Sequence, residues 1–567
     1  MNPAELLANV VVDELIRCGV RHVVLSPGSR SAPLAYAVEQ AERQSRLQLH
    51  IRVDERSAAF LALGLAKVTR VPAAIIMTSG TAVANLHPAV LEADHAGVPL
   101  IVVSADRPAA LRGTGANQTT TQPGMFGGSV RYEFDLPAPA GQVSEMPLWR
   151  STVCRGYAAA TGSLSALAGP AHLNIGLADP LSPAQPGVKL PSDFAGRPES
   201  KPWVAVPPSA ALAPSGTQNP QGESRTLLVV GDLPDAADFA RVVSHAAQAG
   251  WPIIAEPFGA GARGEVLPHG SLLLANESLL EAHPPSRVVT VGRLTLSRDI
   301  ATLTRRSDIR VEHVSATDTW ADPGHVVERV TALNSWLAVE PAPVDGAWAQ
   351  AWRSAGDRLA RRLADSTALP GDESPTGVDI AGATRDAVPE GGILVVGSSN
   401  AARDLDYARA PHTEAVSVIG NRGLAGIDGT TSTAVGIALS TKAPTTLLVG
   451  DLTFLHDING LLIGPAETRP DLTIVVLNDD GGGIFGTLEY GAVRNDSFQR
   501  LFATPTGANL SALCAGYGAR HQIVDTVADL ASTLAQEAAG IRVIEIAVDP
   551  AHHRQRRADL RTAAQLG

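Results

Sequence analysis

The sequence has few cysteines, few lysines and few aromatic side chains. Its three cysteines, Cys18, Cys154 and Cys514, are far apart and odd in number, so they match neither a disulfide framework nor the ligand spacing of a zinc site. We therefore expect a protein of the reducing cytoplasm. Of the 45 basic residues four are lysine and 41 are arginine, a bias that nucleotide composition alone can produce. A role for arginines as two-pronged binders of carboxylates has to be argued site by site.

Patterns that define several other classes of protein are also missing. The formal net charge is −12 and no sustained basic tract offsets it, which argues against nucleic-acid binding. No uncharged apolar run reaches the roughly 18 residues that suggest a membrane span. The first residues have the pattern of a helix start rather than of a secretory signal. The sequence contains no Gly-Lys-Ser/Thr phosphate loop, and the turn after 227–230 lacks the G-x-G-x-x-G of a dinucleotide site.

The sequence does contain a repeated alternation of strand and helix patterns. Its 567 residues are expected to form two or three domains. In residues 1–185 apolar strand patterns, each followed by a polar or glycine-rich turn, alternate with helical stripes, which indicates a parallel sheet. The strands expected there are 22–25, 50–53, 73–77 and 100–103. A stretch rich in Pro, Ser, Gly and Ala, 186–224, is typical of a linker.

The same alternation returns twice after this linker. Residues 225–345 are expected to form a central Rossmann-like domain, 346–376 a second linker, and 377–567 a third domain. The strands expected in the central domain are 227–230, 253–254, 287–291 and 311–314. The predicted fold class is α/β, with three domains that each have a mainly parallel central sheet flanked by helices. A basic segment near the end, 552–561, is interpreted as a solvated face.

Two strand patterns in the third domain end in carboxylates. The run 446–449 leads into Gly450-Asp451, a helix is expected at 456–462, and the run 472–477 leads into Asn478-Asp479-Asp480-Gly481. Because parallel strands present their carboxyl ends at one edge of a sheet, these groups are expected to meet there. Asp451, Asp479 and the carbonyl of Gly481 could supply three of the six oxygens that Mg²⁺ prefers. The competing interpretation is that acidic strand ends are solvated or capping residues.

The spacing of these two turns resembles the signature of thiamine-diphosphate (ThDP) enzymes, Gly-Asp-Gly followed by Asn-Asn. The sequence departs from it at Leu452, in place of the third residue of the first turn, and at Asp479, in place of the second Asn. The resemblance implies ThDP and Mg²⁺ (or Mn²⁺) as cofactors. It also implies that the first domain, 1–185, binds the pyrimidine and that the third, 377–567, binds the diphosphate and the metal. It also implies that Glu55, which follows a strand pattern, binds the aminopyrimidine ring. Taken alone, Glu55 would be interpreted as a helix-start carboxylate that the helix dipole stabilises.

A closer resemblance links nearly the whole chain to the ThDP enzymes of menaquinone biosynthesis. It is strongest in 26–34, 106–108 with 115–118, 398–404, 421–429 and 483–485. It also includes the two turns expected to bind the metal, 450–451 and 478–481, called the metal turns below. It implies that 2-oxoglutarate is decarboxylated and that the resulting carbanion is added to isochorismate. The family places ThDP between the first domain of one subunit and the third domain of another. We therefore expect at least a homodimer, with a homotetramer as the favoured assembly.

The resemblance also assigns roles to residues of these loops. Those expected to hold ThDP are Glu55, Pro27, Ser29, Thr81, Ser399, Asn400, Ile427, Gly450, Asp451, Leu452 and Ile484. Those expected to bind the substrates are Arg30, Arg107, Gln118, Arg298, Arg403, Arg422, Ile484, Phe485 and Leu488. The expected catalytic residues are Glu55, Gln118 and Arg107. Position 297 is Ser here where the family can carry Lys, which leaves its role open.

The charges of the two substrates agree with these residue types. Both are dicarboxylates, and a protein with net charge −12 must gather positive groups locally to hold them. Each arginine can also be a loop-packing or surface residue, the Ser-Asn turn can be a helix cap, and the apolar residues can be core. Another ThDP carboligase or decarboxylase, similar to acetohydroxyacid synthase, is one alternative, although small monocarboxylates need fewer cations. A non-catalytic nucleotide-binding or scaffolding protein on a degenerate ThDP fold is the other.

Overall fold

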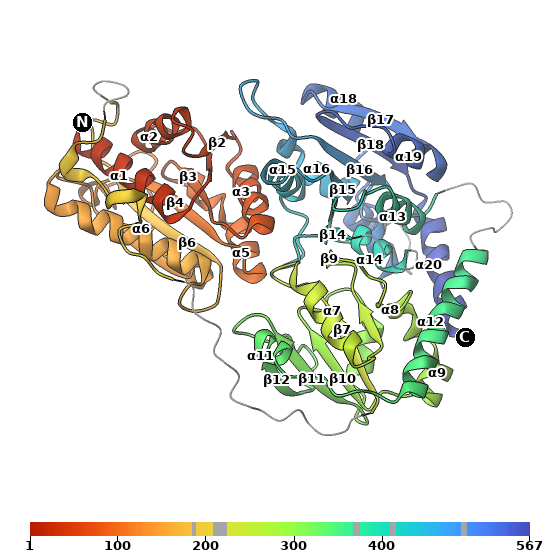
Figure 1. The fold of residues 1–567 in the computed structure, drawn as a ribbon. Helices are drawn as coiled ribbons and strands as arrows, with labels where there is room; N and C mark the ends of the chain where they lie inside the picture. Colours follow the sequence, from red (N-terminus) through yellow and green to blue (C-terminus); the bar gives the residue numbers. More distant parts are fainter. Residues whose placement is uncertain are drawn as a thin grey trace. The chain divides into compact units, whose positions relative to one another are not determined.

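The computed structural model describes residues 1–183, 189–207, 224–366, 375–408, 415–488, 491 and 496–566. The strands of this part of the chain form three sheets, of six, five and seven strands (Figure 1). The chain packs as two compact units. The first contains residues 1–210, 428–442 and 456–470, and the second contains 211–427, 443–455 and 471–567. The predicted α/β class is confirmed, because the described strands pair in parallel except for β9 (Gly259–Gly261) with β14 (Val416–Ile419).

The first unit is built on a parallel sheet with strand order β2-β1-β3-β4-β6-β5. Its strands are β1 (His22–Leu25), β2 (Gln48–Ile51), β3 (Ala73–Met77), β4 (Leu100–Asp106), β5 (Tyr132–Leu136) and β6 (Pro170–Gly176). Its helices include α1 (Pro3–Cys18), α2 (Ala32–Arg43), α3 (Glu55–Thr69), α4 (Thr81–Ala84), α5 (His87–Ala96) and α6 (Met146–Thr161). The strands predicted at 22–25 and 73–77 are confirmed, and the one predicted at 50–53 lies two residues earlier. Apolar side chains of α1 and α6 share one buried core with this sheet.

A helix from far along the chain also belongs to the first unit. This helix, α15 (Thr430–Ser440), packs against α3. Two glycines allow the close approach: an ideal Cβ at Gly64 would lie 2.1 Å from the carbonyl oxygen of Thr433. One at Gly436 would lie 2.2 Å from the carbonyl oxygen of Leu61. Backbone-to-backbone packing therefore explains why both helices carry glycine at their crossing.

The second unit contains the other two sheets. The central sheet has strand order β12-β11-β10-β7-β8, all parallel. Its strands are β7 (Thr226–Val230), β8 (Ile253–Ala255), β10 (Arg287–Val291), β11 (Arg310–Ser315) and β12 (Val327–Ala332). Its helices are α7 (Asp238–Gln248), α8 (Gly270–Leu273), α9 (Glu277–Ala282), α10 (Arg298–Thr304) and α11 (Leu333–Leu337). The strands predicted at 227–230, 253–254, 287–291 and 311–314 are all present, with bounds that differ by at most one residue at each end.

The third sheet has strand order β17-β18-β16-β15-β13-β14-β9. Its other strands are β13 (Ile393–Val396), β15 (Thr445–Gly450), β16 (Leu472–Asn478), β17 (Arg520–Val524) and β18 (Ile541–Ala547). The remaining helices are α12 (Gly346–Ser366), α13 (Gly377–Asp386), α14 (Asn400–Tyr407), α16 (Asp451–His456), α17 (Asp496–Phe498), α18 (Leu510–Gly516), α19 (Val527–Leu534) and α20 (Pro550–Gln565). The long helix α12 lies beside α20 (Figure 1). No helix of the described residues is long and apolar enough to cross a bilayer.

Two local predictions in this region are wrong. The helix expected at 456–462 begins earlier, as α16 at Asp451, and a 3₁₀ turn at Ile458–Leu461 follows it. Apolar periodicity missed this start because the helix opens with a carboxylate, which the helix N-terminus stabilises. The basic segment 552–561 is also more than a solvated face: it lies in α20, and His553 and Leu560 are each 3% exposed. One face of α20 is therefore core, which its run of charged residues concealed.

Candidate active site

A cavity of about 130 Å³ lies at the carboxyl ends of neighbouring strands of the third sheet. The loops that follow β13, β15 and β16 line it, and the turns after β15 and β16 are the two that the sequence predicted to meet. The predicted residues that it brings together are Ser399, Asn400, Ile427, Gly450, Asp451, Leu452, Asp479, Gly481, Ile484 and Phe485. Leu488 is not among the lining residues.

The two carboxylates of the predicted metal site are neighbours in this cavity. Asp451, which is 2% exposed, is the first residue of α16, and Asp479 follows β16. The two carboxyl groups are close enough for the charge of one to act on the ionisation of the other. Burial raises the pKa of both carboxyls above the usual range of aspartate, and the charge of Asp451 raises the pKa of Asp479 further. A divalent cation bound between the two carboxylates would offset both charges.

The turn after β16 needs glycine at two positions. Gly481 has a φ of 138°, outside the range that most side chains adopt. An ideal Cβ at Gly483 would lie 1.7 Å from Oδ2 of Asp479. The glycines thus allow the backbone to pass directly beside the carboxylate, and side chains there would close the space next to it.

The turn after β13 faces the same cavity. Ser399 has a φ of 71° and precedes the first residue of α14, Asn400. Its carbonyl accepts a hydrogen bond of 2.8 Å from Nη1 of Arg403, which holds this unusual turn. The turn thus presents the N-terminus of α14 to the cavity, and a helix N-terminus favours anions such as a diphosphate.

Two buried oxygens indicate that the cavity suits a metal and a diphosphate. Oδ1 of Asp451 and Oδ1 of Asn400 are buried and have no hydrogen-bond partner among the described residues. Buried polar atoms are almost always paired, so such oxygens call for an ion, a water or a ligand. Carboxylate, amide and carbonyl oxygens are the ligands that Mg²⁺ and Mn²⁺ take. The residues present therefore fit a divalent cation beside a helix N-terminus.

Three further side chains support this cavity, and the sequence analysis assigned them no role. Asp404, on α14 and 1% exposed, accepts a 2.9 Å hydrogen bond from Nε of Arg557. His553 Nε2 lies 3.3 Å from Oδ1 of Asp404, and its Nδ1 accepts from the backbone N–H of Gly377 at 3.1 Å. These contacts tie α20 to α14. The signal available in the sequence was the spacing of Asn400 and Asp404, which puts both on one face of a helix.

Three of the predicted substrate arginines lie near one another in the second unit. Burial lowers the pKa of Arg403, and the positive charges of Arg557, Arg422 and Arg298 lower it further. Arg298, the first residue of α10, is exposed. Such a concentration of positive charge is stabilised by an anionic ligand.

Arg422 is the most enclosed of these arginines, at 4% exposed. Its Nη2 donates to Oγ1 of Thr295 at 2.5 Å, and its Nη1 to Oγ of Ser398 at 3.4 Å. Its guanidinium lies 5.2 Å from the ring centre of Phe258. Since Ser398 lines the cavity, these contacts fix a positive charge at its margin.

Glu55 lies in the first unit, as the first residue of α3. Asp54 caps this helix by accepting hydrogen bonds from the backbone N–H groups of Arg56 and Ser57. Nδ2 of Asn85, the residue that follows α4, donates to Oε2 of Glu55 at 3.3 Å. The position suits both interpretations of Glu55, because a partly exposed carboxylate at a helix start can also bind a ligand.

The predicted first-unit substrate residues gather where β3 and β4 end. Arg107 donates through Nη1 to Oγ of Ser79 and, at 2.8 Å, to the carbonyl of Gln118. Nε2 of Gln118 donates to the carbonyl of Ser79 at 3.0 Å. Burial lowers the pKa of Arg107 and the charge of Arg30 lowers it further, so these two guanidinium groups are close. The sequence analysis did not single out Ser79, which holds this group together.

The remaining predicted cofactor residues of the first unit are exposed. Pro27 and Ser29 lie in the turn after β1, and Thr81 is the first residue of α4. Gly28, between Pro27 and Ser29 in the chain, packs tightly: an ideal Cβ there would lie 2.2 Å from Cβ of Thr78. The turn is thus held against β3 while its other side chains face outward.

Comparisons with known proteins place the chain in a family. Residues 6–125 match the model of the thiamine pyrophosphate enzyme N-terminal TPP binding domain, and residues 400–546 match that of the C-terminal TPP binding domain. A 2-succinyl-5-enolpyruvyl-6-hydroxy-3-cyclohexene-1-carboxylate synthase from Kineococcus radiotolerans is 47% identical over 562 residues, 96% of each chain. Proteins of the same name are 43% identical in Saccharopolyspora erythraea, over 98% of this chain and 97% of that one, and 44% identical in Rhodococcus erythropolis, over all of both chains. This chain belongs to the 2-succinyl-5-enolpyruvyl-6-hydroxy-3-cyclohexene-1-carboxylate synthase family.

Members of this synthase family are ThDP-dependent transferases of menaquinone biosynthesis, so the chain is an enzyme of that class. A solved structure agrees with the fold: benzoylformate decarboxylase from Polynucleobacter necessarius has a TM-score of 0.66 and 17% identity, and the match covers 97% of this chain and 99% of that one.

Ser297 has a structural role here, because its Oγ caps α10 by accepting from the N–H of Ile300 at 3.3 Å.

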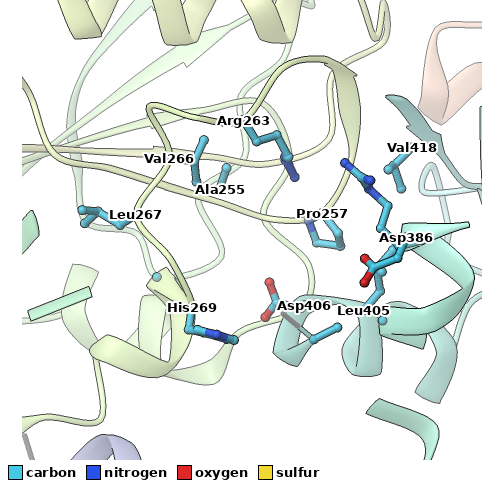
Figure 2. Close-up of a pocket in the computed structure, with 14 residues that line it drawn as sticks. Ala255, Pro257, Arg263, Val266, Leu267, His269, Asp386, Leu405, Asp406 and Val418 are labelled. Carbon is cyan, nitrogen blue, oxygen red and sulfur yellow. The ribbon is translucent and has the colours of Figure 1, made fainter. Parts of the chain in front are cut away.

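A second cavity of the synthase, about 80 Å³, contains none of the predicted residues. Arg263, His269 and Asp406 lie around it (Figure 2). Arg263 is held by the carbonyl of Phe258 at 3.1 Å, and Oγ of Ser271 donates to Asp406 at 2.7 Å. Arg263 and Asp406 are therefore bonded to the protein itself.

Proposed function

We propose that this chain decarboxylates 2-oxoglutarate and adds the remaining four-carbon unit to isochorismate, giving 2-succinyl-5-enolpyruvyl-6-hydroxy-3-cyclohexene-1-carboxylate and CO₂, in the cytoplasm. The observation that supports it most is the cavity in which Asp451 and Asn400 carry buried, unpaired oxygens beside Asp479. That cavity occurs in a chain 47% identical to a protein that bears this synthase name.

The proposed roles in cofactor binding follow from the cavity. Asp451, Asp479 and the carbonyl of Gly481 would hold Mg²⁺ or Mn²⁺, and Ser399 and Asn400 would bind the diphosphate at the start of α14. When bound, ThDP supplies the carbanion chemistry that removes CO₂ from a 2-oxo acid and joins the rest to an acceptor. The apolar residues of the cavity, Ile427 and Ile484 among them, would shape the bound coenzyme.

The proposed roles in substrate binding follow from the arginines. Arg30, Arg107 and Gln118 in the first unit, and Arg298, Arg403 and Arg422 in the second, would bind the carboxylates of the two substrates. Each group of guanidiniums is close enough for mutual repulsion, which a dicarboxylate relieves. Ile484, Phe485 and Leu488 would exclude water from the reacting carbon and so prevent its protonation.

A direct assay tests the reaction. Purified protein with ThDP, Mg²⁺ and 2-oxoglutarate should release CO₂ and form the adduct in proportion to added isochorismate, measured by mass spectrometry. Consumption of pyruvate without any isochorismate adduct would instead support a carboligase similar to acetohydroxyacid synthase. Absence of turnover with every 2-oxo acid, in protein that binds ThDP, would indicate a non-catalytic relative.

The proposed assembly is a homodimer at least, with a homotetramer favoured, in which Glu55 of one subunit and the Asp451–Asp479 pair of another serve one coenzyme. Mixing two inactive variants tests it. Glu55→Gln and Asp451→Asn proteins, unfolded and refolded together, would regain about one quarter of the wild-type activity, since half of the statistical dimers carry one intact site. No recovery, with mixed oligomers verified by mass, would show that both residues act within one chain.

A further inference from the structure

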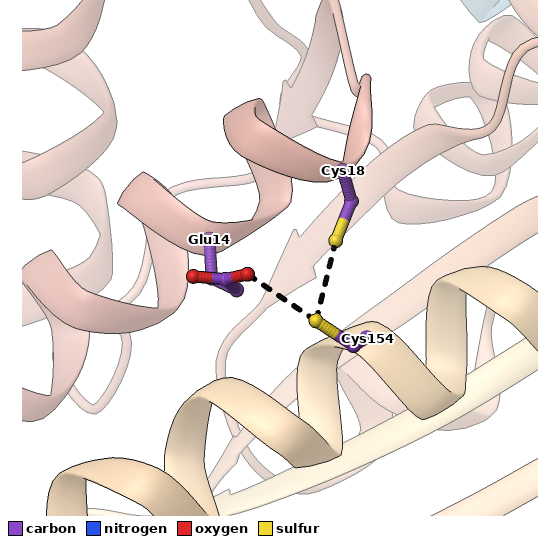
Figure 3. Close-up of side chains that lie close together, drawn as sticks. All are labelled: Glu14, Cys18 and Cys154. Atoms are coloured by element: carbon purple, nitrogen blue, oxygen red, sulfur yellow. Dashed lines mark hydrogen bonds between the residues drawn. The ribbon is translucent and has the colours of Figure 1, made fainter. Parts of the chain in front are cut away.

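Two of the three cysteines lie together in the interior of the first unit, away from every residue assigned to the reaction. Cys18 is the last residue of α1 and is half-buried, and Cys154, on α6, is 3% exposed. Their Sγ atoms are 3.7 Å apart although 136 residues separate them in the chain. Figure 3 shows Cys154 between Cys18 and Glu14. The sequence analysis treated these cysteines as unrelated.

Hydrogen bonds order this cluster. The Cys18 thiol donates to Sγ of Cys154, and the Cys154 thiol donates to Oε1 of Glu14 at 3.2 Å. Glu14 is itself fixed, because Nη1 of the fully buried Arg150 donates to its Oε2 at 2.6 Å. The two sulfurs are thus held at one distance and in one orientation, which ordinary apolar packing of thiols does not require.

We propose that Cys18 and Cys154 are a redox modification site, which a hydroperoxide converts to a reversible disulfide. A disulfide requires an S–S distance of about 2.05 Å, so the sulfurs must close by roughly 1.7 Å, which side-chain rotation and small backbone shifts can supply. Cys18 reaches the surface, so a small oxidant has access to the pair.

The surroundings favour Cys154 as the sulfur that reacts first. Hydrogen bonds from Cys18 and from the backbone N–H of Val204 lower the pKa of Cys154 by more than burial and Glu14 raise it. The hydrogen bond to Cys154 and burial raise the pKa of Cys18. The Cys154 thiolate attacks the hydroperoxide, the O–O bond breaks, and an alcohol (or water) leaves with the proton of that thiol. Cys18 then attacks the resulting sulfenic sulfur: the S–S bond forms, the S–O bond breaks, and the hydroxide leaves as water with the Cys18 proton. Two thiols and one hydroperoxide thus give one disulfide, one alcohol and one water.

The same cluster also holds Trp203 and Val204, in the segment that follows the first sheet. The backbone N–H of Trp203 donates to Oε1 of Glu14 at 2.5 Å, and that of Val204 donates to Sγ of Cys154 at 3.4 Å. Forming the disulfide shifts Sγ of Cys154 from the position in which it accepts the second of these bonds. Oxidation should therefore loosen the attachment of this segment as it joins the two sulfurs.

The experiment uses the full-length protein, reduced and freed of reductant, with hydrogen peroxide as the probe. Peptide mass spectrometry should show a Cys18–Cys154 cross-link two hydrogens lighter than the separate peptides, reversed by dithiothreitol, with Cys514 still free to alkylate. Cys514→Ser is the matched control and should leave the cross-link intact. Hydrogen exchange at the Val204 amide should become faster on oxidation.

Three results would overturn the proposal. One is a folded protein, by circular dichroism, in which peroxide oxidises Cys154 to sulfinic acid without a cross-link. Another is a cross-link between chains in place of one within a chain. The third is stoichiometric zinc in the purified protein that blocks oxidation, because Glu14, Cys18 and Cys154 would then be metal ligands. The wild-type chain suffices for all three, so a variant that fails to fold does not affect the outcome.

Discussion

Oγ of Ser57 donates a 3.1 Å hydrogen bond to Oδ1 of Asp457, 400 residues further along the chain. Asp457 is fully buried and also accepts from the backbone N–H of Ser432, at 2.6 Å, and from its hydroxyl. One carboxylate thus connects α3 with the N-terminal turn of α15, in the same unit in which Gly64 and Gly436 bring these helices together. Ser57, which donates this hydrogen bond, lies two residues after Glu55 on the same helix.

Asp457 should make stability depend on pH. Burial raises its pKa to about 6, against 3.8 for the unfolded chain. A raised folded-state pKa contributes stability that is complete below pH 3.8 and is lost as the pH rises through about 6. Asp457→Asn should therefore gain in melting temperature relative to the wild type between pH 5 and about 7. Asp525→Asn, at an exposed carboxylate, is the control, and an equal pH trend in both variants would contradict the assignment.

Gly64→Ala should destabilise the first unit. The added Cβ would lie 2.1 Å from the carbonyl oxygen of Thr433, so one helix must move, at a cost of about 1–3 kcal/mol. Thermal unfolding would show this as a lower melting temperature. Gly516→Ala provides the matched control, because nothing lies within 4 Å of a Cβ there. Equal melting temperatures for the two variants would mean that α3 and α15 do not pack this closely.

Asp479→Asn should keep the fold and weaken cofactor loading. The variant loses one of two neighbouring carboxylates, so the cation concentration for half-maximal thermal stabilisation, at fixed ThDP, should rise at least about tenfold. Asp480→Asn is the control: Asp480 is exposed and accepts from the backbone N–H groups of Thr506 and Gly507. Unchanged Mg²⁺ dependence in Asp479→Asn would remove Asp479 from the proposed ligands.

Arg107→Lys should lower kcat/KM by roughly 10- to 100-fold, the range expected for hydrogen bonds to a charged group. Lysine keeps the charge but not the planar guanidinium, whose Nη1 contacts Ser79 and Gln118 and whose other nitrogens remain for a carboxylate. Steady-state kinetics with varied 2-oxoglutarate and varied isochorismate would show which substrate depends on it. Arg306→Lys, at an arginine that pairs with Asp308 on the surface, should leave both constants unchanged. An equal loss of kcat/KM in Arg306→Lys would mean that the effect is not specific to position 107.

Much of the fold could be predicted from the amino-acid sequence alone. Runs such as Ala73–Met77 and 227–230 are buried on both faces of parallel sheets, so they are apolar throughout and visible in the sequence. The turns after these strands were visible too, because glycine and carboxylates mark them. The metal turns were found in this way, the Ser399–Asn400 turn was found by its resemblance to the family, and the structure places all three around one cavity.

Other features depend on which segments meet in space. The Asp404–Arg557 pair, the Cys18–Cys154 pair and the Ser57–Asp457 bond each join residues more than a hundred positions apart. Local periodicity carries no information about such pairs, because either partner alone has the pattern of a surface charge, a buried thiol or a helix-cap residue. Their chemistry arises when packing removes water from both partners at once, and that happens only when the chain has folded.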